Sequence, residues 1–247
     1  MELIDPLILV ISLPGSTERQ ERVRAQLSKT QFSWEFLEAV RGAALASPPK
    51  EYQPKKVRRL LGFELTPNEI GCFLSHKKAW QRCVAANRPT LIFEDDFQLM
   101  PHFENVISYL MAHPERWSAV RLQGLFLVDQ ELLEDLGKFR IVRNQGDAVG
   151  ATAYMINSEI AKRLLQASQD LYEPLDHFLE HQSKHGIEFA AIDPYPVDIT
   201  GAKTTIADRP GRAPIVGYRK SIRSAYRCLD RLFSSDPWFP RQFKKKP

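Results

Sequence analysis

Short apolar segments separated by helical patterns run through most of this 247-residue chain, and they limit the folds that it can adopt. Residues 7–13 are nearly all apolar, and Pro14-Gly15 ends the run, as expected for a strand that is buried on both faces. Further short strands are predicted at 32–40, 90–93, 119–122, 149–156 and 190–193. Because helical patterns lie between them, the sequence predicts an α/β fold, a mostly parallel sheet with helices on both faces.

The clearest helix start is Thr66-Pro67-Asn68-Glu69. A threonine cap, a proline at the first helical position and a glutamate three residues after the cap form a capping box. This pattern predicts a helix that runs to about Asn87, since Pro89 ends it. Other helices are expected after Ser16 or Thr17, over 101–113, after Asn157 or Ser158, and from Pro174 to about Gly186, with a loop over 43–53.

The net charge of +4 is distributed unevenly along the chain. Residues 218–247 carry nine basic and two acidic side chains, so this segment is +7 and residues 1–217 are −3. A slightly acidic body is a poor match for a phosphate backbone, so no nucleic-acid partner is expected. The charge divides the chain into one domain, 1–217, and a basic tail, 218–247.

Three consecutive carboxylates, Glu94-Asp95-Asp96, directly follow the predicted strand 90–93. Such side chains repel one another unless a cation or several donors lie nearby. The carboxyl ends of strands are also where open α/β sheets bind ligands, and Mg²⁺ or Mn²⁺ prefers carboxylates combined with phosphate oxygens. The triplet therefore indicates a metal and diphosphate site, although a solvated turn that caps the next helix is an alternative.

Several further motifs accompany the acidic triplet, over about residues 7–200. They are Leu65-Thr66-Pro67-Asn68-Glu69-Ile70-Gly71-Cys72-Phe73-Leu74-Ser75-His76 with Trp80, 91–96, Val10-Ile11-Ser12-Leu13 with Ser16-Thr17 and Arg19, Ala39-Val40 with Gly42, 150–156 and Pro174-Leu175-Asp176. Together these motifs resemble glycosyltransferase family 25, which contains bacterial lipopolysaccharide and lipooligosaccharide sugar transferases, including β-1,4-galactosyltransferases.

That resemblance implies a GT-A fold and an inverting transfer of a hexose, with galactose expected, from a UDP-sugar to a lipooligosaccharide, lipopolysaccharide or related surface-glycan acceptor. It implies a Mn²⁺ or Mg²⁺ cofactor held by Asp96 with help from Asp95. The implied donor-binding residues are Ser12, Arg19, Glu69, His76, Glu94 and Asp95. An inverting transfer needs a base for the acceptor hydroxyl, and Asp176 is the predicted base, with Asp147 and Asp198 as competitors.

Three of these residues also have ordinary structural explanations. Glu69 is the capping-box acid, His76 fits a core or surface histidine, and Asp176 fits an acid favoured by a helix N-terminus. The chain also departs from the family pattern, with Ser12 and Pro14-Gly15 where relatives commonly carry Asn and then Asp-Arg, and with Arg41 in place of the usual Asp before Gly42. These departures keep a second class open: a catalytically silent, membrane-associated protein that binds a glycan or nucleotide.

A competing metal motif lies on the helix predicted after Pro174. His177-Phe178-Leu179-Glu180-His181 fits the H-x-x-E-H signature of inverted zinc peptidases, and His185 continues the same row. The pattern specifies only three residues, and the one later glutamate, Glu188, is too near in sequence to be the third ligand. A solvated helix face or the wall of an acceptor groove is the favoured interpretation.

The basic tail has the pattern of an interfacial membrane helix. Ile222, Leu229 and Phe233 share one helical face, bordered by arginines and lysines, and Trp238, Phe239 and Phe243 follow among further bases. A C-terminal helix packed on the domain is the alternative. Neither a signal peptide nor a membrane span is expected at 1–13, and Cys72 and Cys83 are too far apart on one helix to bridge. We therefore expect a cytoplasmic protein, peripheral on the inner face of the bacterial inner membrane.

Overall fold

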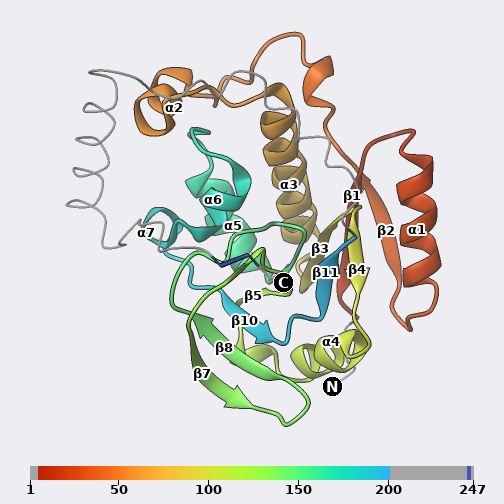
Figure 1. Cartoon of the computed structure of the whole chain (residues 1–247). Coiled ribbons are helices and arrows are strands. Elements are labelled where there is room, and N and C mark those ends of the chain that lie inside the picture. The colour runs from red at the N-terminus through yellow and green to blue at the C-terminus, as the bar shows by residue number, and fades with distance from the viewer. Residues whose placement is uncertain (1–4, 201–243, 246–247) are drawn as a thin grey trace.

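The computed structural model describes residues 5–200 and 244–245, and an eight-stranded sheet forms its centre (Figure 1). The strand order is β2-β1-β3-β9-β5-β10-β8-β7. These strands are β1 (Leu7–Ser12), β2 (Trp34–Glu38), β3 (Thr90–Glu94), β5 (Ala119–Arg121), β7 (Gln130–Asp135), β8 (Arg140–Asn144), β9 (Ala153–Ile156) and β10 (Ala190–Asp193). The predicted α/β class is confirmed.

The sheet is mixed, with most of its strands running in one direction. β1 is parallel to both β2 and β3, and β10 is parallel to β5. β9 lies antiparallel between β3 and β5, and β8 lies antiparallel between β10 and β7. Six of the eight strands therefore share one direction, and only β8 and β9 oppose them.

Helices cover both faces of the sheet, as the sequence predicts. Alternate residues of β1 point to opposite faces, so Leu9 packs in one hydrophobic cluster and Val10 in the other. The Leu9 face is covered by α2 (Pro54–Leu61), α3 (Pro67–Ala86), α5 (Ser158–Ala167) and α6 (Leu175–Glu180). The Val10 face is covered by α1 (Thr17–Leu27) and α4 (Phe103–Ala112). The resulting three-layer arrangement buries every residue of β1.

Helix α3 begins and ends where the sequence predicts. The Thr66 hydroxyl accepts from the backbone N–H of Glu69, and the Glu69 carboxylate accepts from the backbone N–H of Thr66, which completes the capping box. Asn87, with a φ of 48°, ends the helix in the left-handed conformation. Asn157 caps α5 by accepting from the backbone N–H of Ile160.

Some elements differ from the sequence predictions. α2 was not predicted, because its octapeptide is basic and buries only Val57 and Leu61. The β7 segment is mostly exposed and so lacks the apolar signal of a buried strand. The helix expected from Pro174 to Gly186 is broken at His181, where α7 (Gln182–His185) begins. The remaining elements are two 3₁₀ helices (Gly42–Ala44 and Pro114–Arg116), β4 (Phe97–Leu99), which pairs with β11 (Val197–Ile199), and β6 (Phe126–Leu127), which pairs with β12 (Lys244–Lys245).

Two glycines let the start of α3 lie against the 3₁₀ helix at Gly42–Ala44. A Cβ at Gly42 would lie 1.7 Å from the backbone oxygen of Pro67, and a Cβ at Gly71 would lie 2.6 Å from that of Val40. Ser75 joins the two segments, since its hydroxyl accepts from the backbone N–H of Val40 at 2.8 Å and donates to the backbone oxygen of Gly71 at 2.7 Å. This close approach sets the position of the first two turns of α3.

The basic segment 218–247 lies outside the described residues except for Lys244–Lys245. The amphipathic helix expected there is therefore not described. Cys72 and Cys83 are both free thiols, as expected from their separation along α3. Within residues 5–200 and 244–245, we find no helix with the length and apolarity that crossing a bilayer requires.

Replacing Gly42 by alanine tests the close approach. Because the added methyl would overlap the backbone of Pro67 rather than a flexible side chain, we expect Gly42→Ala to destabilise the fold by about 1–3 kcal/mol or more. The control is Gly146→Ala, where a Cβ would meet Val128 at an ordinary 3.8 Å. Urea unfolding measures both, and equal unfolding midpoints would contradict the packing argument.

His185, at the end of α7, is buried as a neutral imidazole. Its Nε2–H donates to the backbone oxygen of Phe178 at 3.0 Å, and its Nδ1 accepts from the backbone N–H of Ile187 at 3.0 Å. The pKa of His185 is lowered to about 4, mainly by burial; the bond to Phe178 and the charge of Glu173 act against the shift, and the neighbouring His181 acts with it. Protonation would also break the bond from Ile187, because a protonated ring has no acceptor.

Stability should therefore fall with pH between about 6.5 and 4. In this range the unfolded chain binds a proton at His185 that the folded chain does not, so the free energy of unfolding decreases as pH falls, by about 3 kcal/mol in total for this group. His185→Gln keeps a donor and an acceptor but does not titrate. Urea unfolding of both proteins from pH 7 to 4 measures the difference, and identical pH profiles would contradict the assignment.

Candidate functional site

A pocket of about 280 Å³ opens at the carboxyl ends of β1 and β3. The chain passes from β1 to its neighbour β2 through α1, which packs on one face of the sheet. It then reaches β3, the neighbour on the other side of β1, through α3, which packs on the opposite face. The pocket thus lies where the strand order reverses, the usual ligand position of an open α/β sheet. Its lining includes Ser12, Arg19, Arg41, Cys72, His76 and the triplet Glu94-Asp95-Asp96.

Asp95 is held by residues of the β1–α1 segment. The Ser12 hydroxyl donates to one carboxylate oxygen at 2.7 Å, and the Arg19 guanidinium donates to the other at 2.6 Å. Gln20 donates in turn to the Ser12 hydroxyl at 3.3 Å. The guanidinium balances the charge of Asp95 and fixes the direction of its carboxylate.

Asp96 is the acid whose charge is least satisfied. Its Oδ1 is buried and has no hydrogen-bond partner among the residues that the structure describes, and Arg19 lies 4.0 Å from its other oxygen. Burial and the neighbouring charge of Glu94 raise the pKa of Asp96 to about 6, against the opposing effect of Arg19. A buried carboxylate oxygen without a donor is what a hard divalent cation would complete.

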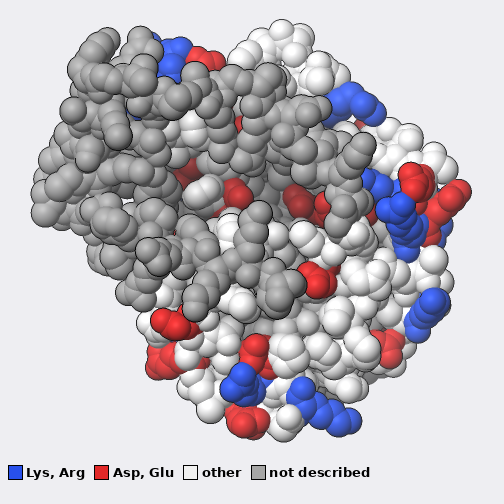
Figure 2. Space-filling view, in the orientation of Figure 1, with Lys and Arg blue, Asp and Glu red and all other residues white. Residues whose placement is uncertain are grey.

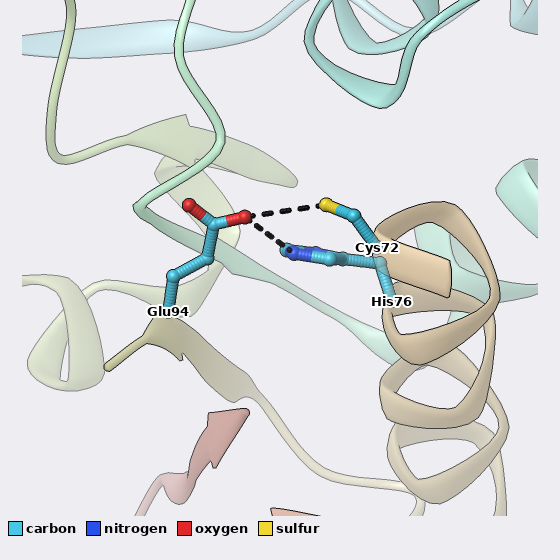
Figure 3. Close-up of side chains that lie close together, drawn as sticks. All are labelled: Cys72, His76 and Glu94. Carbon is cyan, nitrogen blue, oxygen red and sulfur yellow. Dashed lines mark hydrogen bonds and ion pairs between the residues drawn. The ribbon is translucent and has the colours of Figure 1, made fainter. Parts of the chain in front are cut away.

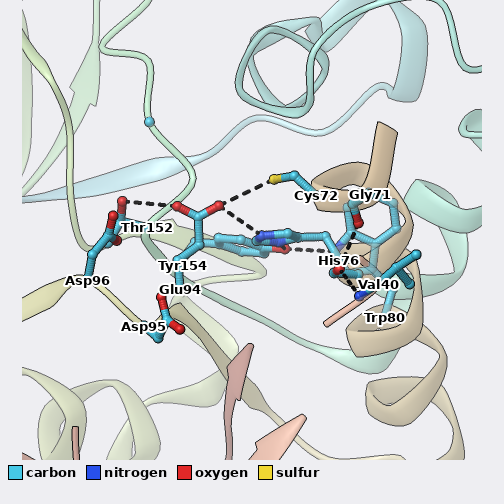
Figure 4. Close-up of polar contacts among 12 residues, drawn as sticks. Val40, Gly71, Cys72, His76, Trp80, Glu94, Asp95, Asp96, Thr152 and Tyr154 are labelled. Carbon is cyan, nitrogen blue, oxygen red and sulfur yellow. Dashed lines mark hydrogen bonds and ion pairs between the residues drawn. The ribbon is translucent and has the colours of Figure 1, made fainter. Parts of the chain in front are cut away.

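Glu94 is fixed from both sides (Figure 4). One carboxylate oxygen accepts from the Cys72 thiol at 3.4 Å and lies 3.5 Å from His76 Nε2. The other accepts from the Thr152 hydroxyl at 3.4 Å. Burial acts to raise the pKa of Glu94, but His76 and the donors outweigh it, so the pKa lies below its ordinary value.

His76 is positioned by aromatic side chains beneath the pocket. Its Nδ1 lies 2.8 Å from the Tyr154 hydroxyl, which also accepts from the indole N–H of Trp80 at 2.8 Å. The imidazole is stacked on the Tyr154 ring and is fully buried. The helix face that carries Cys72 and His76 is thereby fixed against β9.

The structure brings most of the sequence-predicted residues together. Ser12, Arg19, His76, Glu94, Asp95 and Asp96 all line the pocket. Glu69 is buried in its capping box, and within the described part of the chain Asn68 lines the pocket in its place. Asp176 is half-buried at the start of α6 and accepts from the backbone N–H of His177, outside the described pocket lining. The pKa of the Cys72 thiol is raised mainly by burial and by the charge of Glu94, and the charge of Asp176 adds a smaller effect.

The H-x-x-E-H residues do not converge on one site. Nδ1 of His181 pairs with Glu173 at 3.1 Å, Glu180 pairs with Arg121 at 3.0 Å, and both nitrogens of His185 are bonded to the backbone. Among residues 5–200 and 244–245, the group of three or more His, Cys, Asp or Glu side chains with ligand geometry is Cys72, His76 and Glu94. The zinc-peptidase alternative is therefore not supported.

Sequence reasoning overlooked Cys72 and Thr152 as partners of Glu94. Cys72 belongs to the motif that resembles the family but has no predicted role in the site, although it lies one helical turn from His76 and so shares its face. The i, i+4 spacing of Cys72 and His76 on the predicted helix could therefore have indicated that both side chains face the same site. Thr152 had none, because its contact depends on the antiparallel pairing of β9 with β3.

The charges of the pocket favour a cation together with an anion. Three acids and two arginines line it, so a diphosphate would meet a surplus of negative charge unless a divalent cation entered with it. On the face shown in Figure 2, acidic side chains lie near the middle while Lys and Arg lie mainly towards the edges.

Comparison of the sequence with known proteins identifies its family. The sequence profile described as Glycosyltransferase family 25 (LPS biosynthesis protein) matches residues 5–179. The Haemophilus influenzae protein named Lipooligosaccharide biosynthesis protein lic2B is 28% identical over 170 residues, which cover 63% of this chain and 60% of that protein. The Homo sapiens protein named Inactive glycosyltransferase 25 family member 3 is 30% identical over 184 residues, 70% of this chain but 31% of the relative.

The chain thus spans less than two thirds of these relatives. A solved structure, of a glycosyltransferase involved in the glycosylation of the major capsid of PBCV-1, gives a TM-score of 0.44 at 10% identity, covering 90% of this chain and 98% of that one. The family profile covers more than half of the present sequence, including β1, α3 and the acidic triplet. The chain therefore belongs to glycosyltransferase family 25.

Proposed function

We propose that this protein is an inverting, UDP-sugar-dependent glycosyltransferase of the GT-A type. It transfers a hexose, galactose, to a lipooligosaccharide, lipopolysaccharide or related surface-glycan acceptor. The observation that carries the proposal is the buried, partly unsatisfied Asp96 beside the fixed Asp95, in a pocket at the ends of β1 and β3. Family membership supplies the reaction class.

Asp96 would hold a divalent cation, Mn²⁺ or Mg²⁺, because its buried Oδ1 needs a positive partner and a carboxylate suits such ions. Bound there with a diphosphate, the ion would stabilise the charge that develops on the departing UDP. Asp95 lines the same pocket, and Ser12 and Arg19 each donate to one of its oxygens, so each oxygen keeps capacity to accept a further bond or to help hold the cation.

Glu94 is placed to bind the donor through hydroxyl groups. Its side chain is 29% exposed although Cys72, His76 and Thr152 hold both of its oxygens, so the exposed edge can still accept from a sugar hydroxyl. His76 would act from below by fixing Glu94. Glu69 would support the pocket through the start of α3, as its capping-box contacts place Asn68 at the lining.

Asp176 remains the proposed base for the acceptor hydroxyl. The support is that its carboxylate is half-buried at the start of α6 and that its charge contributes to raising the pKa of the Cys72 thiol in the pocket, after burial and Glu94. A base in this position would remove the acceptor proton during attack on the sugar.

A catalytically silent binding protein of the same fold is the second candidate. It is favoured by the match to an animal relative named as inactive and by the presence of Ser12, Gly15 and Arg41 where the family pattern differs. Arg41 lines the pocket and donates to the backbone oxygen of Pro14 at 3.2 Å, so it is placed to change the binding of a donor.

Two substitutions separate the proposed roles of the acids. We expect Asp96→Ala to lower UDP release from a UDP-sugar with added Mn²⁺ on the order of a hundredfold or more, because the cation loses its ligand. We expect Asp176→Asn to retain this slow donor hydrolysis but to lower acceptor-dependent transfer by about 10²–10⁴-fold. Both rates are measured by UDP release with and without a glycan acceptor.

The control is Glu21→Ala, an exposed acid on α1 outside the described pocket lining. It should leave both rates unchanged. Undiminished turnover of Asp96→Ala would remove that residue from the mechanism. If the unaltered protein binds UDP-sugars in a thermal-shift screen but releases no UDP with any of them, the silent binding protein replaces the transferase.

We also propose that residues 218–247 attach the protein to an anionic membrane, on the cytoplasmic face of the bacterial inner membrane, where a lipid-linked acceptor would lie. The support is the sequence pattern, since each base near an anionic leaflet contributes roughly 1 kcal/mol. In vesicle co-sedimentation the full chain should bind phosphatidylglycerol-containing vesicles and a variant ending at Gly217 should not. Binding should weaken as salt is raised. Equal failure of both proteins to bind would contradict the proposal.

A further inference from the structure

Cys72, His76 and Glu94 form a cluster in the pocket wall that a hard-cation site does not explain (Figure 3). The thiol and the imidazole come from successive turns of α3, and the carboxylate comes from the end of β3. One ligand atom from each lies within 4.8 Å of the other two. The set combines sulfur, nitrogen and oxygen, whereas Mg²⁺ and Mn²⁺ prefer oxygen ligands.

From this geometry we infer that the cluster is a binding site for Zn²⁺, separate from the cation position at Asp96. In a tetrahedral zinc site with ordinary bond lengths, two neighbouring ligand atoms lie about 3.4–3.6 Å apart. Glu94 Oε1 lies 3.4 Å from Cys72 Sγ and 3.5 Å from His76 Nε2. Two of the three ligand separations thus already have the values that zinc requires.

His76 supplies an independent observation. Its ring is fully buried, and among the described residues its Nε2 makes only the 3.5 Å ion-pair contact to Glu94 Oε1, which does not meet hydrogen-bond geometry. A buried ring nitrogen that is this poorly satisfied is costly, and a metal would satisfy it. With zinc on Nε2, the remaining proton lies on Nδ1, 2.8 Å from the Tyr154 hydroxyl, which gives the outer hydrogen bond that metal-binding histidines usually make.

The position of the cluster in the pocket wall and the chemistry of its ligands also suit zinc. All three residues line the pocket, so the ion can enter from solvent and keep a water or substrate oxygen as its fourth ligand. Binding converts the Cys72 thiol to a thiolate and releases its proton, with no change in oxidation state. The inference rests on the cluster and not on the proposed transferase activity, so zinc binding can be tested without a UDP-sugar.

The test uses the full-length protein after removal of metals with a chelator. Equilibrium dialysis against Zn²⁺ in excess Mg²⁺ should give one tight zinc per chain in the unaltered protein. Cys72→Ser and Glu94→Gln should each weaken this binding at least about a hundredfold, because each removes a ligand, and Tyr154→Phe should weaken it about tenfold through the outer hydrogen bond. Thermal unfolding without metal verifies that each variant is folded.

Cys83→Ala and Cys228→Ala are the matched controls, and both should bind zinc as the unaltered protein does. Cys83 is on the same helix but outside the cluster. Replacement of zinc by Co²⁺ should give a thiolate-to-cobalt charge-transfer band in the near ultraviolet that is lost in Cys72→Ser. Absence of tight zinc, absence of this band, or zinc that survives in Cys72→Ser and disappears in His181→Gln would overturn the inference. Failure of UDP release alone would leave it intact.

Discussion

The parallel pairing of β1 with β3 is the constraint on which the site depends. In this register Ile11 lies opposite Glu94, so the two strands end side by side. Ser12 then follows at the position where its hydroxyl reaches Asp95, and α1 begins close enough for Arg19 to reach the same carboxylate. A shift of β3 by one residue relative to β1 would change the face to which Glu94 and Asp95 point and remove both contacts to Asp95.

The opposite side of the pocket depends on how closely α3 lies against the chain that follows β2. Gly42 and Gly71 permit backbone contact that any side chain would prevent, and Ser75 bonds the two segments together. Tyr154, on β9, fixes the same helix from below through His76. The antiparallel strand β9 is therefore part of the site, because it supplies this tyrosine, and Thr152, directly before β9, donates to Glu94.

The sequence predicts most clearly those features that depend on neighbouring residues. The capping box at Thr66, the buried run at 7–13 and the acidic triplet each have a local physical signature, and the structure confirms the helix and both strands. The orientation of β9 and the β7–β8 hairpin depend on long-range pairing, and the exposed β7 has no apolar pattern. The family resemblance implies separate roles for the three acids, but the sequence does not predict the partner of each acid, since these partners come from distant segments.

The three adjacent carboxylates are made different by those partners. Arg19 and Ser12 satisfy Asp95, and Cys72, Thr152 and His76 surround Glu94, whereas Asp96 keeps a buried oxygen without a donor among the described residues. Burial and the negative charge of Glu94 therefore act most strongly on Asp96 and raise its pKa to about 6. The pKa of Glu94 is lowered instead, because His76 and the hydrogen-bond donors stabilise its charge. At neutral pH Asp96 is still mainly ionised, but its charge is the one that a cation would stabilise most. A hard cation, as proposed at Asp96, would be held by oxygen, and zinc, as proposed at Glu94, by sulfur, nitrogen and oxygen, so ions of different chemistry would distinguish the two positions.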